Sequence, residues 1–141
     1  MIFAILFATI AFVCFGCSAA ATSHAPIITE VYYDTYLVGD TNGEFIRIHN
    51  PTESSINIGG WEITDYGERE GVITFPVGAN MDSGGSLYLA YNATAFYEEM
   101  LIRADFEYGV DSDSTPDMKR VGTFWLKNTG DEVILRTAKA R

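Results

Sequence analysis

The sequence predicts an all-β sandwich that contains one short helix. Short runs of alternating apolar and polar residues recur along the chain, and turn-forming residues separate them. The composition agrees, because nine Phe and eight Tyr accompany 13 Gly and many β-branched residues. A chain of 141 residues is long enough for one domain with one core.

The stretch 43–65 organises the predicted sheets. Ile46 and Ile48 alternate with polar residues until Pro51 ends the strand, because proline fixes φ and donates no backbone hydrogen bond. A second short strand leads into a Gly-Gly corner at 59–60, and a third strand leaves it. We expect one shared core made of Ile46, Ile48, Ile58, Trp61, Ile63, Leu87, Leu89, Val133 and Leu135.

The remaining strands follow from the same kind of pattern. Residues 27–33 are apolar on both faces, which predicts a central strand. Further strands are expected at 72–75, 86–91, 124–127 and 132–136. The last two strands form a hairpin through 128–131, and residues 105–120 form a long acidic loop.

One segment has helical rather than strand periodicity. It runs from about Ala93 to Arg103, and Asn92 or Thr94 is available as N-cap. One side of the helix is expected to carry Phe96, Tyr97, Met100 and Leu101. This aromatic stripe indicates packing rather than a cofactor site.

Residues 1–21 are predicted to be a secretory signal peptide. Ile2–Phe15 is an apolar run too short to span a bilayer comfortably, and small residues follow it at 18–21. No Lys or Arg precedes the run, so either the signal is weak or the true start lies upstream. Cys17 follows a small residue, and its lipidation is an alternative to simple cleavage. Residues 22–26 then form a linker, and the domain occupies 27–141.

The charge of the chain excludes some partners. Nineteen Asp and Glu face nine Lys and Arg, so the formal net charge is −10. The charge therefore disfavours nucleic acid as a ligand, because its recognition needs clustered Lys and Arg to neutralise phosphates. Contact with a membrane is expected only through the signal segment or a lipid anchor.

An ordered series of motifs carries a resemblance to a known family. The series consists of Ile28-Thr29-Glu30-Val31, residues 44–51 (EFIRIHNP), residues 58–65 (IGGWEITD), Phe75-Pro76-Val77-Gly78, Gly84-Gly85-Ser86-Leu87 and residues 126–135 (LKNTGDEVIL). In this order the motifs resemble the lamin tail domain, and the signal-like start resembles its secreted prokaryotic members. The resemblance implies an immunoglobulin-like β-sandwich, which in some relatives is an accessory module beside a phosphodiesterase or nuclease domain.

The resemblance also raises a question about the end of the domain. The family usually continues past the strand at 133–135 with at least one more strand, whereas this sequence stops at Arg141. Whether the sandwich is complete in this polypeptide therefore stays open. We expect an exposed strand edge here, through which the chain could self-associate.

Catalysis has little support in the sequence. The two histidines, His24 and His49, lie in the linker and beside a turn, and no cysteine nucleophile or Gly-x-Ser-x-Gly motif lies in the domain. We therefore expect no enzyme and no cofactor.

Two candidate sites for binding or modification remain. Asp111, Asp113 and Asp117 offer oxygen ligands for weak calcium binding, against the alternative of a solvated acidic surface. Asn92 begins an Asn-Ala-Thr sequon for N-glycosylation, against the alternative of a helix cap.

The sequence is best interpreted as a secreted or cell-surface, non-catalytic binding or accessory module. Its expected partners are proteins or extracellular polymers, reached through loops and strand edges. Two alternatives are an N-terminal accessory domain of a phosphodiesterase or nuclease whose catalytic part is missing, and a calcium-dependent adhesion domain.

Overall fold

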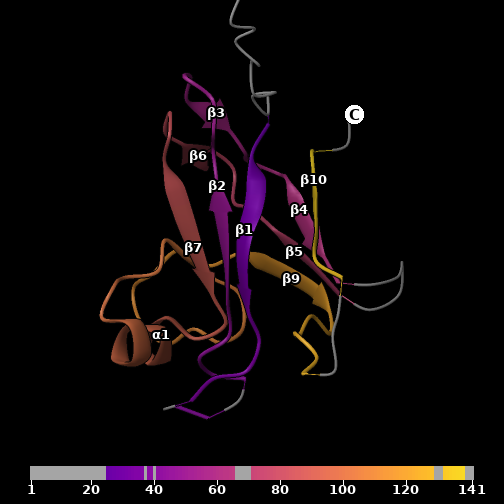
Figure 1. The fold of residues 1–141 in the computed structure, drawn as a ribbon. Helices are drawn as coiled ribbons and strands as arrows, with labels where there is room; N and C mark the ends of the chain where they lie inside the picture. The colour runs from indigo at the N-terminus through magenta and orange to yellow at the C-terminus, as the bar shows by residue number, and fades with distance from the viewer. Residues whose placement is uncertain (1–24, 37, 40, 66–70, 129–131, 139–141) are drawn as a thin grey trace, which may run out of the picture.

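A computed structural model describes residues 25–36, 38–39, 41–65, 71–128 and 132–138. Two four-stranded sheets face each other in these residues, with strand orders β1-β2-β7-β8 and β10-β4-β5-β9, and β3 and β6 form a third, two-stranded sheet (Figure 1). The strands are β1 (Ile27–Tyr32), β2 (Phe45–His49), β3 (Ile56–Asn57), β4 (Glu62–Thr64), β5 (Gly71–Thr74), β6 (Asn80–Met81), β7 (Ser86–Ala90), β8 (Phe106–Glu107), β9 (Lys119–Gly122) and β10 (Ile134–Arg136). The single described helix is α1 (Ala93–Met100). The predicted all-β sandwich with one short helix is confirmed.

The space between the two sheets is the main core. Five of the nine expected core residues have no exposed surface: Ile46, Ile48, Ile58, Ile63 and Leu89. The other four, Trp61, Leu87, Val133 and Leu135, are partly buried and pack against this core. Aromatic rings fill much of the remaining volume, with edge-to-face pairs between Phe75 and Phe106 and between Tyr108 and Phe124.

A second, smaller apolar cluster lies on the outer face of the first sheet. Phe45, Ala90 and Phe96 are buried there, and Tyr32 stacks on Phe45 with ring centroids 5.1 Å apart. Because α1 covers this part of the sheet, strand residues that point away from the main core are also apolar (Figure 1).

This second cluster explains why the position predicted for residues 27–33 is wrong. β1 is an edge strand, paired only with β2 among the described strands, and Ile27 is 42% exposed. Ile28 and Val31 pack on the main core, whereas Tyr32 packs on the outer cluster. The apolar residues of β1 therefore serve the main core, the outer cluster and, at Ile27, the surface, and they do not indicate a central position in the sheet.

The helix is shorter than the sequence indicates. It ends at Met100, because Leu101 adopts a left-handed conformation (φ 57°) and donates its N–H to the Tyr97 carbonyl. Of the expected apolar stripe, Phe96 is buried and Met100 is partly buried, but Tyr97 and Leu101 are exposed. The predicted length and half of the predicted stripe are therefore wrong.

Two other local predictions are also wrong. The expected acidic loop 105–120 contains β8 and the first residues of β9, because Phe106 and Tyr108 are drawn into the core. The expected hairpin between 124–127 and 132–136 does not form, since β10 pairs with β4 and residues 124–127 belong to no strand. Part of the expected connection, residues 129–131, lies outside the described residues.

Candidate interaction surfaces

The outer edge of β10 is the clearest candidate for an interaction surface. β10 is the outermost strand of its sheet, and among the described strands it pairs only with β4 (Figure 1). The antiparallel register places Ile134 opposite Thr64, Leu135 opposite Ile63 and Arg136 opposite Glu62. One edge of β10 is thereby bound, and no other described strand pairs with its second edge, which makes that edge the candidate for adding a further strand.

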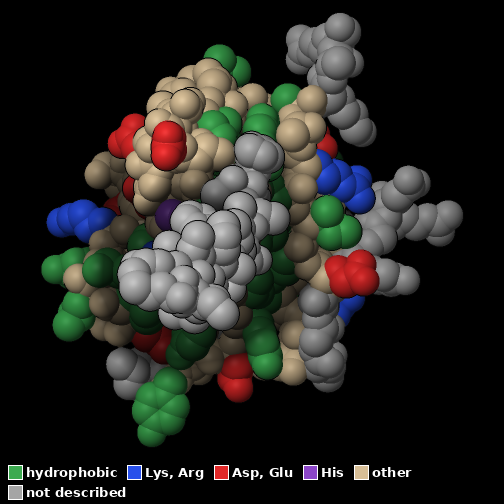
Figure 2. All heavy atoms as spheres, turned by 45° about the horizontal axis from the view of Figure 1, so that its top comes forward, with side chains coloured by type: hydrophobic (Ala, Val, Ile, Leu, Met, Phe, Trp, Pro, Cys, Tyr) green, Lys and Arg blue, Asp and Glu red, His purple; other side chains and the backbone are tan. Residues whose placement is uncertain are grey.

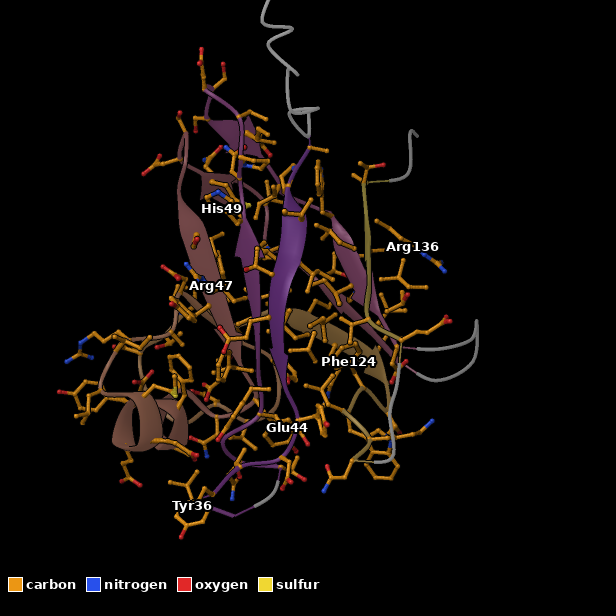
Figure 3. All side chains as sticks on the ribbon, viewed as in Figure 1. Tyr36, Glu44, Arg47, His49, Phe124 and Arg136 are labelled. Carbon is orange, nitrogen blue, oxygen red and sulfur yellow. The ribbon has the colours of Figure 1, made fainter. Side chains whose placement is uncertain are left out.

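The faces of β10 differ in character. Leu135 and Val133 pack against the main core, so Ile134 and Arg136 belong to the outer face of the sheet. Arg136 is exposed, and in Figure 3 its side chain points away from the ribbon. Any strand added beside β10 would therefore meet an apolar row on one face and a cation on the other.

β9 forms the opposite edge of the same sheet. All four of its residues are exposed, and nearby Trp125 is 51% exposed. Arg120 lies 5.9 Å from the centroid of the Tyr91 ring, so its guanidinium already has an aromatic partner.

In the view of Figure 2, exposed hydrophobic side chains project at several separate points, and charged side chains lie between them.

His49 belongs to a polar cluster on the outer face of β2 and β7. Its Nδ1 lies 3.1 Å from Ser86 Oγ, and Arg47 Nη2 donates to the same oxygen at 3.3 Å. The Arg47 guanidinium also lies 5.4 Å from the centroid of the Tyr88 ring. Cross-strand register accounts for these contacts, because Arg47 stands opposite Tyr88 and His49 opposite Ser86.

The predicted calcium ligands do not converge. Asp111, Asp113 and Asp117 are all exposed, and no group of three or more His, Cys, Asp or Glu in the described part of the chain could hold a metal ion. Asp113 Oδ1 accepts a hydrogen bond from the Thr115 N–H, and bonds from the Thr115 side chain and backbone lower the pKa of Asp113. The side chain of Asp113 thus stabilises a turn within the loop.

Glu107 holds this loop against the helix. The side chain is fully buried, and its Oε1 accepts from the Ala93 N–H at 2.6 Å and from the Ser112 hydroxyl. Its Oε2 accepts from the Ser112 N–H at 2.9 Å. A buried carboxylate at the N-terminus of α1 therefore orders the segment that carries the acidic residues.

Of the two predicted modification sites, Asn92 lies within the described residues and Cys17 does not. Asn92 is the N-cap of α1, and its Oδ1 accepts from the Ala95 N–H at 2.9 Å. The side chain thus has the capping role that the sequence offered as the alternative to glycosylation. Cys17 and the predicted signal peptide lie outside the described residues. Within those residues, no helix is long and apolar enough to cross a membrane.

Sequence reasoning missed three important buried polar groups. Glu107 is one, and Asn50 is another, with no exposed surface and hydrogen bonds to Thr52, Ser54 and Asp82. The Asn-Pro turn was a signal for Asn50, but nothing in the sequence marks Glu107. The third is Tyr108, whose hydroxyl is buried without a described hydrogen-bond partner; burial raises its pKa well above the ordinary value.

Two facing sheets with one short helix define an immunoglobulin-like β-sandwich. The family model of the Lamin Tail Domain matches residues 19–141, and the chain belongs to this family of non-enzymatic domains. A search of curated proteins gives no match.

Proposed function

We propose that the chain is an exported, non-catalytic binding module that holds an extended segment of a protein partner along the outer edge of β10. The apolar run at residues 2–15 supports secretion or attachment at the cell surface. The net charge of −10 favours a protein partner, or an uncharged extracellular polymer, over nucleic acid.

The observation that carries the proposal is the position of β10 at the end of its sheet. In the described part of the chain, β4 alone pairs with it. Strand addition to such an edge supplies main-chain hydrogen bonds for affinity, and alternate side chains supply specificity. The exposed guanidinium of Arg136 favours a partner with a carboxylate on the outer face.

NMR titration of the ¹⁵N-labelled chain tests the proposal. The probe is a peptide with the sequence Glu-Val-Thr-Val-Thr-Val-Thr, acetylated and amidated at its ends, which alternates as a strand and carries a carboxylate only on its Glu side chain. Shift changes should concentrate at 133–137 and in β4, and the matched peptide with Lys in place of Glu should bind more weakly. Shift changes confined to loops, or none at millimolar peptide, would contradict strand addition at β10.

A further inference from the structure

The segment 132–136 is self-complementary when two copies run antiparallel. Its sequence is Glu-Val-Ile-Leu-Arg, with a carboxylate at one end, a guanidinium at the other and three apolar residues between them. A two-fold axis through Ile134 places Glu132 of each copy opposite Arg136 of the other. Opposite charges in directly opposed positions stabilise an antiparallel pair.

The same register also matches the faces of the two sheets. Val133 and Leu135 both pack against the core of their own domain, and this register sets them opposite each other. Ile134 and Arg136 lie on the outer face, and this register sets outer residues against outer residues. Every side chain near the axis therefore stays on the same side of the sheet, core-facing or outward, as in the single domain.

The alternative register centred on Leu135 is less favourable. It would set Glu132 opposite Ala138 and Ile134 opposite Arg136, so both charge pairs would be lost. The charges thus select one register, which joins two sheets through their β10 strands into one continuous sheet.

From this complementarity we infer that a second copy of the chain is a partner of the β10 edge, bound antiparallel about Ile134. The inference rests on the proposed function, because it needs the outer edge of β10 to be open. β10 is short, so the pairing is weak and reversible. Each copy carries a net charge of −10, which opposes association, but physiological salt screens charges that lie beyond about 8 Å.

Reciprocal charge reversal tests the inference in the full chain. Glu132→Arg and Arg136→Glu each set like charges opposite each other twice in a homodimer. Sedimentation at concentrations up to about 0.5 mM, where weak interfaces become populated, should show self-association of each variant weakened roughly tenfold or more. The double variant Glu132→Arg/Arg136→Glu should recover the original association, and the reversal Lys119→Glu on β9 is the matched control that should not weaken it.

A mixture of the two single variants is the decisive arm. The Glu132→Arg chain has Arg at both positions of the pair, and the Arg136→Glu chain has Glu at both. The two chains therefore complement each other, and the mixture should form mixed dimers although neither variant pairs with itself. A mixture that stays monomeric, or a double variant that fails to recover, would overturn this register. If the natural chain is monomeric but still binds the Glu-Val-Thr peptide at β10, self-pairing is refuted while the proposed function stands.

Discussion

Replacement of Glu107 by Gln should loosen the attachment of the acidic loop to the helix. Gln keeps the size of the side chain but exchanges one acceptor oxygen for an NH₂ group, which must then face the N–H of Ala93 or of Ser112. Hydrogen bonds to a charged acceptor contribute about 1.5–3 kcal/mol each. Loss of the charge and of one acceptor should therefore cost about 2–4 kcal/mol in the free energy of unfolding.

Urea unfolding followed by Trp fluorescence measures this loss. Glu98→Gln is the matched control, because Glu98 lies exposed on the same helix and its replacement should change stability by less than about 0.5 kcal/mol. Amide exchange in residues 111–117 should accelerate in the Glu107→Gln variant, and calcium at millimolar concentration should not restore it. A cost below about 1 kcal/mol, or rescue by calcium, would refute the idea that this carboxylate orders the loop.

Three further predictions concern other parts of the chain. Asn50→Asp should cost about 3–5 kcal/mol in the free energy of unfolding, because a carboxylate oxygen would replace the amide NH₂ group that donates to the Ser54 and Asp82 carbonyls. Exposed Asn80→Asp is the control, and equal losses in urea melts would refute the argument. Burial raises the pKa of Tyr108, so the folded state keeps a proton that the unfolded state releases above about pH 10, and the free energy of unfolding should fall as the pH rises from there. Tyr108→Phe should reduce this fall in urea titrations at alkaline pH, and an unchanged dependence of stability on pH would contradict the prediction. Mass spectrometry of the native protein should find an N-terminus between about residues 17 and 25, and an intact Met1 in a soluble cytoplasmic protein would contradict export.

The sequence predicts the sandwich well because strand periodicity and turn chemistry are local signals. Ile46 and Ile48 alternate with Arg47, and the structure buries the first two and leaves Arg47 on the outer face. The position of β1 could not be predicted in this way. Its apolar residues serve two different clusters, and which sheet edge a strand occupies depends on contacts between distant parts of the chain.

The candidate surfaces were predicted less completely than the fold. The strand that ends at Arg136 follows from the sequence, but the pairing of β10 with β4 does not, because the expected partner was the neighbouring segment 124–127. The role of Glu107 depends on bringing β8 beside the first turn of α1. No local pattern reports such an approach, so a buried acceptor and a solvated carboxylate look alike in the sequence.

Amide hydrogen exchange along residues 132–138 in dilute solution tests most directly whether the outer edge of β10 is open. Successive amides of an edge strand point alternately toward its partner and away from it. If the outer edge is open, protected and unprotected amides should alternate along β10, while both neighbours protect the amides of β4. Added peptide or a higher protein concentration should then protect the exposed set. Slow exchange at every amide of 132–136 in a dilute monomer would contradict an open edge, because another segment of the chain would then already occupy it.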